Sequence, residues 1–212
     1  MTNIYLEISE KKTFACALQW PGWYRSGKTE AEAIQALVDS APHYQVIARK
    51  AGLEFAPGAP VVVERVRGDM TTSFGAPSII VTADSEPIAA AAAERGAALL
   101  RAAWTILDEA ITTAPNELRK GPRGGGRERD EIAQHVIESE RAYARKIGVK
   151  HRPFSPNDLA AVTALREEIA TVLSQPSNGS PLIPGGWPTS YATRRIAWHV
   201  IDHIWEIEDR QT

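Results

Sequence analysis

The hydrophobic periodicity of the chain changes near residue 84, and this change constrains the fold more than any other feature. Before it, apolar residues alternate with polar ones in short runs, as in Ile4, Leu6 and Ile8, which is typical of half-buried strands. After it, apolar residues recur at the spacing of amphipathic helices. We therefore expect an α+β domain over residues 1–83, formed by a small sheet plus a helix, followed by an all-α domain over residues 84–212.

The first part also carries a helix-start signal. Thr29 is followed three residues later by Glu32, which is the pattern of a capping box. The sequence predicts a helix from Glu30 to about Lys50 that Pro42 kinks or ends, because a proline ring clashes with the preceding turn. Further strands are expected at residues 14–18, 61–63 and 79–81.

The second part has the pattern of four long helices joined by loops. We expect the first to be capped by Asp84 or Ser85, with Pro87 in its first turn. Helices of this length and spacing are typical of an up-down four-helix bundle. The helices are expected at about residues 84–113, 128–147, 159–174 and 189–209, with a glycine-rich turn at residues 121–126.

Composition excludes several classes of protein. The apolar fraction of 43% and the charged fraction of 24% are ordinary for a globular chain. The net charge of -2 gives no basic excess for a phosphate backbone, so no nucleic-acid partner is expected. The single cysteine, Cys16, excludes an internal disulfide, and the N-terminus lacks the apolar core of a signal peptide. The alanine-rich run near residue 90 is interrupted by Glu94 and Arg95, so no membrane association is expected.

We expect a cytoplasmic protein with a small-molecule substrate, and leave open whether it is a monomer or a homodimer.

Three histidines form the most informative chemical pattern. His199 and His203 lie four residues apart, so on a helix both imidazoles leave the same face. They share that face with Ile196, and His135 shares a face with Ile132 in another helix, so all three are expected to point inward. Three imidazoles from two helices would hold a divalent metal ion and leave a coordination position open.

Other interpretations of these residues stay open. A buried histidine can also be satisfied by a hydrogen bond to a carboxylate or carbonyl group. A zincin protease is disfavoured, because Val200 stands where its helix needs a glutamate. Arg195 would hold an anionic ligand or lie on a solvated surface. Three carboxylates would orient the imidazoles or belong to a solvated helix face, namely Glu138, Asp202 and Glu206.

Residues 89–209 resemble the DinB/YfiT-like family of four-helix metal-binding proteins. The resemblance rests on residues 104–107, Pro115, the loop at 120–126, residues 135–143 and residues 195–203. It implies that His135, His199 and His203 bind a divalent ion, Zn or Ni, and that a low-molecular-weight thiol serves as a cofactor. The chain departs from the family at residues 127–129, which read Arg-Glu-Arg where a tryptophan is common.

The N-terminal part resembles HicB-like domains, on residues 14–33. Such domains combine a small sheet with one helix and occur in antitoxins and as detached modules.

Two functions follow as expectations. The first is a metal-dependent, thiol-using transferase, isomerase or hydrolase. The alternative is a non-catalytic binding or regulatory module, in which a HicB-like domain is fused to a metal-binding bundle.

Overall fold

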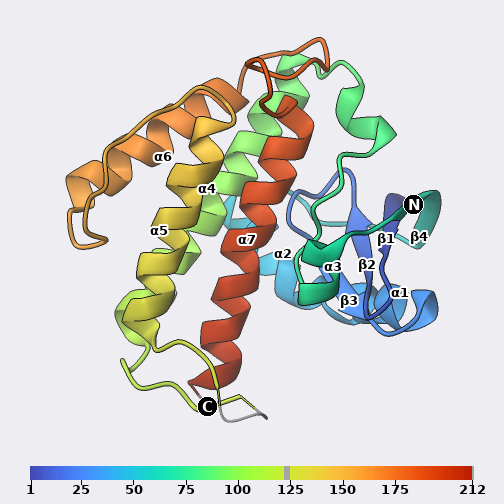
Figure 1. Cartoon of the computed structure of the whole chain (residues 1–212). Helices are drawn as coiled ribbons and strands as arrows, with labels where there is room; N and C mark the ends of the chain where they lie inside the picture. Colours follow the sequence, from blue (N-terminus) through green and yellow to red (C-terminus); the bar gives the residue numbers. More distant parts are fainter. Residues whose placement is uncertain (122–124, 212) are drawn as a thin grey trace.

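The computed structural model describes residues 1–121 and 125–211, and its fold is α+β (Figure 1). A four-stranded mixed sheet in the order β3-β2-β1-β4 is followed mostly by helices. β1 pairs antiparallel with β2 and parallel with β4, which leaves β3 and β4 at the two edges. The strands are β1 Thr2–Ile8, β2 Thr13–Ala17, β3 Tyr24–Gly27 and β4 Pro60–Arg67. The strands expected at residues 14–18 and 61–63 are confirmed, and β3 was not predicted.

The helix expected after Thr29 is present but divided in two. The Thr29 hydroxyl accepts from the Glu32 N–H at 3.2 Å, and the Glu32 carboxylate accepts from the Lys28 N–H at 2.9 Å. α1 Glu30–Asp39 then ends at Ser40, and α2 Ala41–Lys50 carries Pro42 in its first turn. The prediction that Pro42 ends or kinks the helix is therefore confirmed, since a proline is tolerated only near a helix start.

The strand expected at residues 79–81 is wrong. The amide groups of Ser78 and Ile79 donate to the carboxylate of Glu7 at 2.9 and 3.1 Å, and the Val81 amide donates to Asp84 at 2.9 Å. These backbone donors are thus satisfied by side chains, and no neighbouring strand is needed. The segment instead joins the short helix α3 Met70–Phe74 to the 3-10 turn η1 Thr82–Ser85.

Four long helices form the second half of the chain. The first begins at Ala90, so the start expected at Asp84 or Ser85 is wrong by about one and a half turns. Asp84 is used elsewhere, because its carboxylate caps η1 and pairs with Arg194. Part of the glycine-rich turn expected at residues 121–126, namely residues 122–124, lies outside the described residues. The helices are α4 Ala90–Thr113, α5 Arg129–Arg145, α6 Leu159–Leu173 and α7 Thr189–Arg210.

The four helices do not simply alternate in direction. Asp130 and Gln134 near the start of α5 line the same cavity as Leu159 at the start of α6, and Glu140 bonds Arg166 about two to three turns further along the two helices. α5 and α6 therefore run parallel, and residues 146–158 return along the bundle to make this possible. This differs from the up-down arrangement that the helix lengths and loops suggested.

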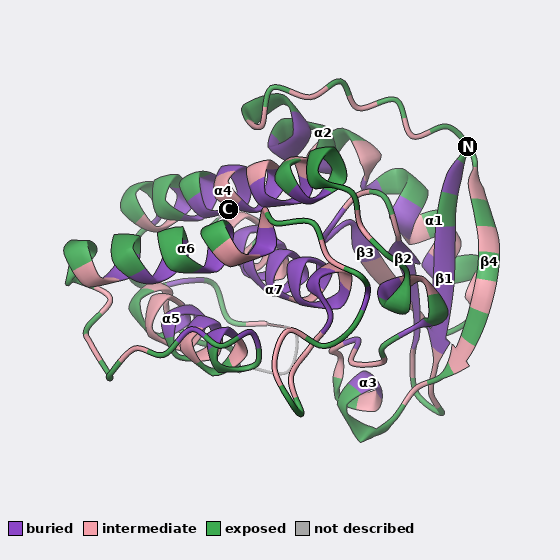
Figure 2. Ribbon diagram, turned by 90° about the horizontal axis from the view of Figure 1, so that it is seen from above, coloured by how far each residue is buried: buried purple, intermediate pink, exposed green. Residues whose placement is uncertain are grey.

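α7 lies between the other three long helices and the sheet (Figure 2). Trp198 packs edge-on against Phe14 of β2, with ring centroids 6.2 Å apart. Trp205 stacks on His43 of α2 at 4.7 Å, and the guanidinium of Arg25 lies 3.5 Å from the Trp205 ring centroid. The helix is therefore buried over most of its length. Within the described residues, no helix combines the length and the apolar character that crossing a membrane requires.

Candidate metal centre

The structure brings His135, His199 and His203 together between α5 and α7. One ring nitrogen of each histidine lies within 4.8 Å of those of the other two, so the cluster could hold a metal ion. The Nε2 atoms of His135 and His199 are 3.1 Å apart. The His199 and His203 side chains are buried, with 7% and 6% of their surface exposed, while His135 is partly open to solvent. The expected inward orientation is confirmed for all three.

Burial keeps two of these imidazoles neutral. It lowers the pKa of His135 to about 4, with His203 and Arg127 adding electrostatic repulsion. Burial also lowers the pKa of His199 well below its usual range, again with help from neighbouring positive charge. A neutral imidazole has a lone pair on one ring nitrogen, which is the form that binds a metal ion.

His203 is oriented by a carboxylate on its own helix. Its Nδ1 is 2.8 Å from the carboxylate of Glu206, whose other oxygen accepts from Arg210 at 2.8 Å. Although burial opposes ionisation, these two partners lower the pKa of Glu206, so that it stays an anion. The Nδ1 proton of His203 is therefore fixed, and Nε2 is left to face the cluster, as in many metal-bound histidines.

The other two carboxylates named from the sequence lie differently. Glu138 is exposed on α5 and accepts from Gln134 at 2.6 Å. Asp202 is half-buried on α7, and burial raises its pKa while electrostatic interactions with His203 and Arg25 oppose the rise. In contrast to Glu206, neither makes a hydrogen bond to the three histidines in the described part of the chain.

Arg195 and Tyr143 extend the site along the two helices. Arg195 lies one turn before His199 on α7, and its Nη2 donates to the Tyr143 hydroxyl at 3.1 Å. The Tyr143 ring in turn meets the His199 ring edge-on at 5.5 Å. A polar stripe thus follows one face of α7, through Arg195, His199, His203, Glu206 and Arg210.

The spacing of two of the three donors is close to that in a tetrahedral metal site. Nitrogen ligands at about 2.0–2.1 Å from zinc lie about 3.3–3.4 Å apart, which is close to the 3.1 Å between the His135 and His199 nitrogens. The four-coordinate geometry has one position beyond these three ligands. Three imidazole nitrogens are suited to zinc, nickel, copper and iron alike, so the ligands do not select the metal.

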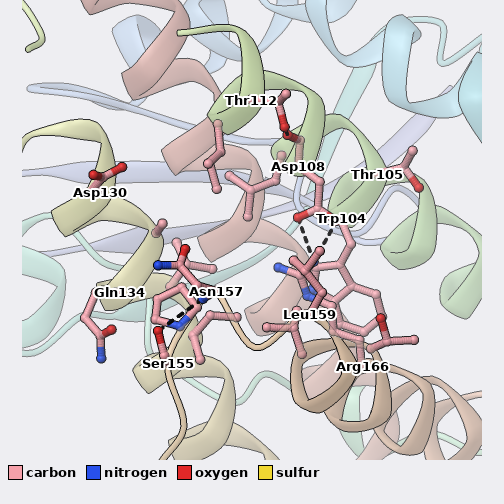
Figure 3. A pocket seen from close by; sticks show the side chains of 18 of the residues that line it. Trp104, Thr105, Asp108, Thr112, Asp130, Gln134, Ser155, Asn157, Leu159 and Arg166 are labelled. Atoms are coloured by element: carbon pink, nitrogen blue, oxygen red, sulfur yellow. Dashed lines mark hydrogen bonds and ion pairs between the residues drawn. The ribbon is translucent and has the colours of Figure 1, made fainter. Parts of the chain in front are cut away.

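A separate cavity of about 910 Å³ opens between α4, α5 and α6 (Figure 3). Arg166 lies in its wall and pairs with Asp108 at 2.9 Å, while Leu159 at its rim is 74% exposed. None of the three histidines lines this cavity, because they leave α5 and α7 on another side. We therefore place the candidate chemistry at the histidine cluster and not in this cavity.

Comparison with known proteins found no match among family models, curated proteins or solved structures.

Sequence reasoning missed some of the surroundings of the site. Tyr143 was not among the candidate site residues, and its contact with Arg195 depends on the antiparallel alignment of α5 and α7. His43 was not among them either; it lies on α2, stacks on Trp205 and is 2.5 Å from Glu208. The eight-residue interval from His135 to Tyr143, which keeps both on one helix face, is the signal that could have linked them.

Proposed function

We propose that this protein binds a divalent metal ion, zinc or nickel, through His135, His199 and His203, and that it acts on a small molecule as a metal-dependent enzyme. The observation that carries the proposal is the convergence of three ring nitrogens within 4.8 Å, from two different helices. Three protein ligands with a further coordination position are typical of catalytic metal sites, whereas structural sites fill all four.

The ion would supply Lewis acidity at the open position. The protein's own residues would set the geometry around it. Glu206 holds the His203 ring by its Nδ1 proton, and Arg210 holds Glu206. The Tyr143 ring limits rotation of His199 from the side of α5. His135 is the ligand nearest to solvent, so we infer that substrate enters past α5.

We further propose that a low-molecular-weight thiol is the co-substrate, and that the reaction is a transfer or an isomerisation, with hydrolysis as the variant that uses water. A thiol suits a site of this kind because the thiolate is both a good nucleophile and a good metal ligand. The DinB-like resemblance of residues 89–209 supports the same assignment.

The first test is metal uptake. Chelator-treated protein is titrated with zinc and with nickel in competition with a chromophoric chelator, and the metal content is checked by elemental analysis. We expect about one ion per chain, and we expect His203→Ala to lose at least about 100-fold in affinity, because it removes one of three ligands. His151→Ala is the matched control, since His151 pairs with Glu168 at 3.1 Å, away from the cluster. We expect this variant to bind the metal ion as tightly as the unaltered protein.

The second test is turnover. Zinc-loaded and nickel-loaded protein is assayed with small thiols and an activated aryl halide, and release of halide is followed. We expect thiol-dependent turnover that His203→Ala abolishes. A protein that takes up neither ion would refute the whole proposal. A protein that binds metal but is idle with every thiol would favour the alternative, a metal-binding bundle that serves a non-catalytic module.

A further inference from the structure

At its N-terminal end, the polar stripe on α7 contains two buried nitrogen atoms that have no hydrogen-bond partner among the described residues. The Nη1 atom of Arg195 is buried and has no hydrogen-bond partner among the residues that the structure describes. The same holds for Nδ1 of His199, one helical turn further along the same face. Buried polar atoms are almost always paired, so two orphans one turn apart point to a missing partner.

The missing partner must be an acceptor. A guanidinium group only donates. If Nε2 of His199 faces a metal ion, the neutral ring carries its proton on Nδ1, which is then a donor as well. The Tyr143 hydroxyl accepts from Arg195, and its own proton has no acceptor within residues 1–121 and 125–211. Three donors therefore lie on neighbouring side chains beside the histidine cluster, since Arg195 bonds Tyr143 and the Tyr143 ring meets the His199 ring.

The charge of Arg195 also lacks a counter-ion. Arg166 pairs with Glu140 and Asp108, and Arg194 pairs with Asp84. Arg195 instead lies 4.8 Å from the Trp198 ring centroid and 5.3 Å from that of Tyr143, and it makes no ion pair in the described part of the chain. Aromatic faces stabilise a cation without accepting its in-plane N–H bonds. The guanidinium is thus positioned, positively charged and only partly hydrogen-bonded.

We propose that Arg195, Tyr143 and His199 bind the carboxylate of a small-molecule substrate or thiol. This inference rests on the proposed function, because the carboxylate would then lie beside the metal ion. An ionised carboxylate only accepts, at about four lone-pair sites, and so matches a set of three donors. Its single negative charge matches the single guanidinium, and hydrogen bonds between the two are of the strong, charge-assisted kind.

The test compares two thiols that differ in a carboxylate. Mercaptoacetate and 2-mercaptoethanol are titrated into zinc-loaded protein by calorimetry. We expect mercaptoacetate to bind at least about tenfold more tightly than 2-mercaptoethanol, and we expect this ratio to fall to about one in Arg195→Gln. Arg65→Gln is the matched control, because it removes one exposed positive charge on β4 and should keep the ratio.

Two further variants test the same inference in case Arg195→Gln does not fold. Arg195→Lys keeps the charge and the aliphatic stem beside Trp198, and we expect a ratio between those of the unaltered protein and Arg195→Gln. Tyr143→Phe removes one donor and should lower the ratio a few-fold. Circular dichroism and the thermal midpoint of each variant confirm that the compared proteins are folded.

A metal-free experiment separates this inference from the proposed function. Acetate is added to chelator-treated protein, and the side-chain Nε signal of Arg195 is followed by NMR. A saturable shift in the unaltered protein that Tyr143→Phe weakens supports the carboxylate site even if zinc does not bind. Equal binding of the two thiols together with no acetate shift, or an unchanged ratio in Arg195→Gln, would overturn it and leave water as the acceptor.

Discussion

At the scale of single residues, the site depends on which atoms near each histidine are donors or acceptors. Glu206 and Glu138 look alike in sequence, since both flank a candidate ligand at a spacing of three residues. Only Glu206 meets an imidazole, because it follows His203 on the inward face while Glu138 turns outward. Helix periodicity predicted that the three histidines would lie together. It could not predict their orienting partners, which depend on side-chain rotamers.

The two glutamates give a matched prediction. Glu206→Gln should weaken zinc binding by about 10–100-fold, because the His203 tautomer is no longer fixed by an anion. Glu138→Gln should leave the affinity unchanged. Competition with a chromophoric chelator measures both. Equal affinities for the two variants would show that the Glu206 contact does not orient a ligand.

The tyrosines predict a response to alkaline pH. Burial raises the pKa of Tyr191 to about 12, and it raises the pKa values of Tyr5, Tyr24 and Tyr44 above their usual range. The unfolded chain loses these protons near a pH of about 10, whereas the folded chain keeps them. The free energy of unfolding should therefore fall as the pH rises above about 10.

Ultraviolet difference absorbance measures this effect. At a pH of about 11, most of the tyrosinate signal should appear only together with the loss of circular dichroism. If four of the five tyrosines ionise while the protein is still folded, the burial argument fails.

At the scale of elements, the sequence predicted the helices well and their mutual directions poorly. Hydrophobic periodicity and caps such as Asp158, which accepts from the Ala161 N–H at 3.1 Å, define where a helix begins. The parallel course of α5 and α6 depends on contacts between residues far apart in the chain, which local pattern does not encode. Glu140 and Arg166, both buried, form one such contact at 3.1 Å.

That buried pair gives a prediction for α4, α5 and α6. Glu140→Gln should lower the free energy of unfolding by about 3–5 kcal/mol, because it leaves the Arg166 charge poorly compensated in the interior. Asp108→Asn is the control. It removes the other partner of Arg166, but the Asp108 side chain is 60% exposed, so the loss should be about 1 kcal/mol or less. Urea unfolding measures both, and similar losses for the two would contradict the argument.

At the scale of the whole molecule, the sheet and the four long helices share contacts through α7. Phe14 meets Trp198, and Asp84 pairs with Arg194, so residues before position 85 contact the helix that carries two of the three histidines. The change of periodicity near residue 84 located the transition from strands to helices. It could not reveal these contacts, because Asp84 reads in sequence as an ordinary helix cap.

These contacts predict that metal binding stabilises the whole chain. Zinc at about 100 times its dissociation constant should raise the free energy of unfolding by about 2.7 kcal/mol. Hydrogen exchange should slow in β1 and β2 as well as in α5 and α7, since Phe14 packs on Trp198 and both strands share a hydrophobic core with α7. The chelator-treated protein is the reference. Slower exchange confined to α5 and α7 would show that the sheet unfolds independently.

The placement of Trp198 and Trp205 has a consequence for dividing this chain. The two tryptophans adjoin the ligand pair, one directly before His199 and the other two residues after His203. Their partners, Phe14 and Arg25, lie on β2 and β3. A rotation of α7 that redirected the imidazoles would also break the contacts of both indole rings with Phe14 and Arg25. A fragment starting at residue 84 would keep every proposed ligand but would lack Phe14 and Arg25. We therefore expect its histidines to be held less rigidly than those of the full chain.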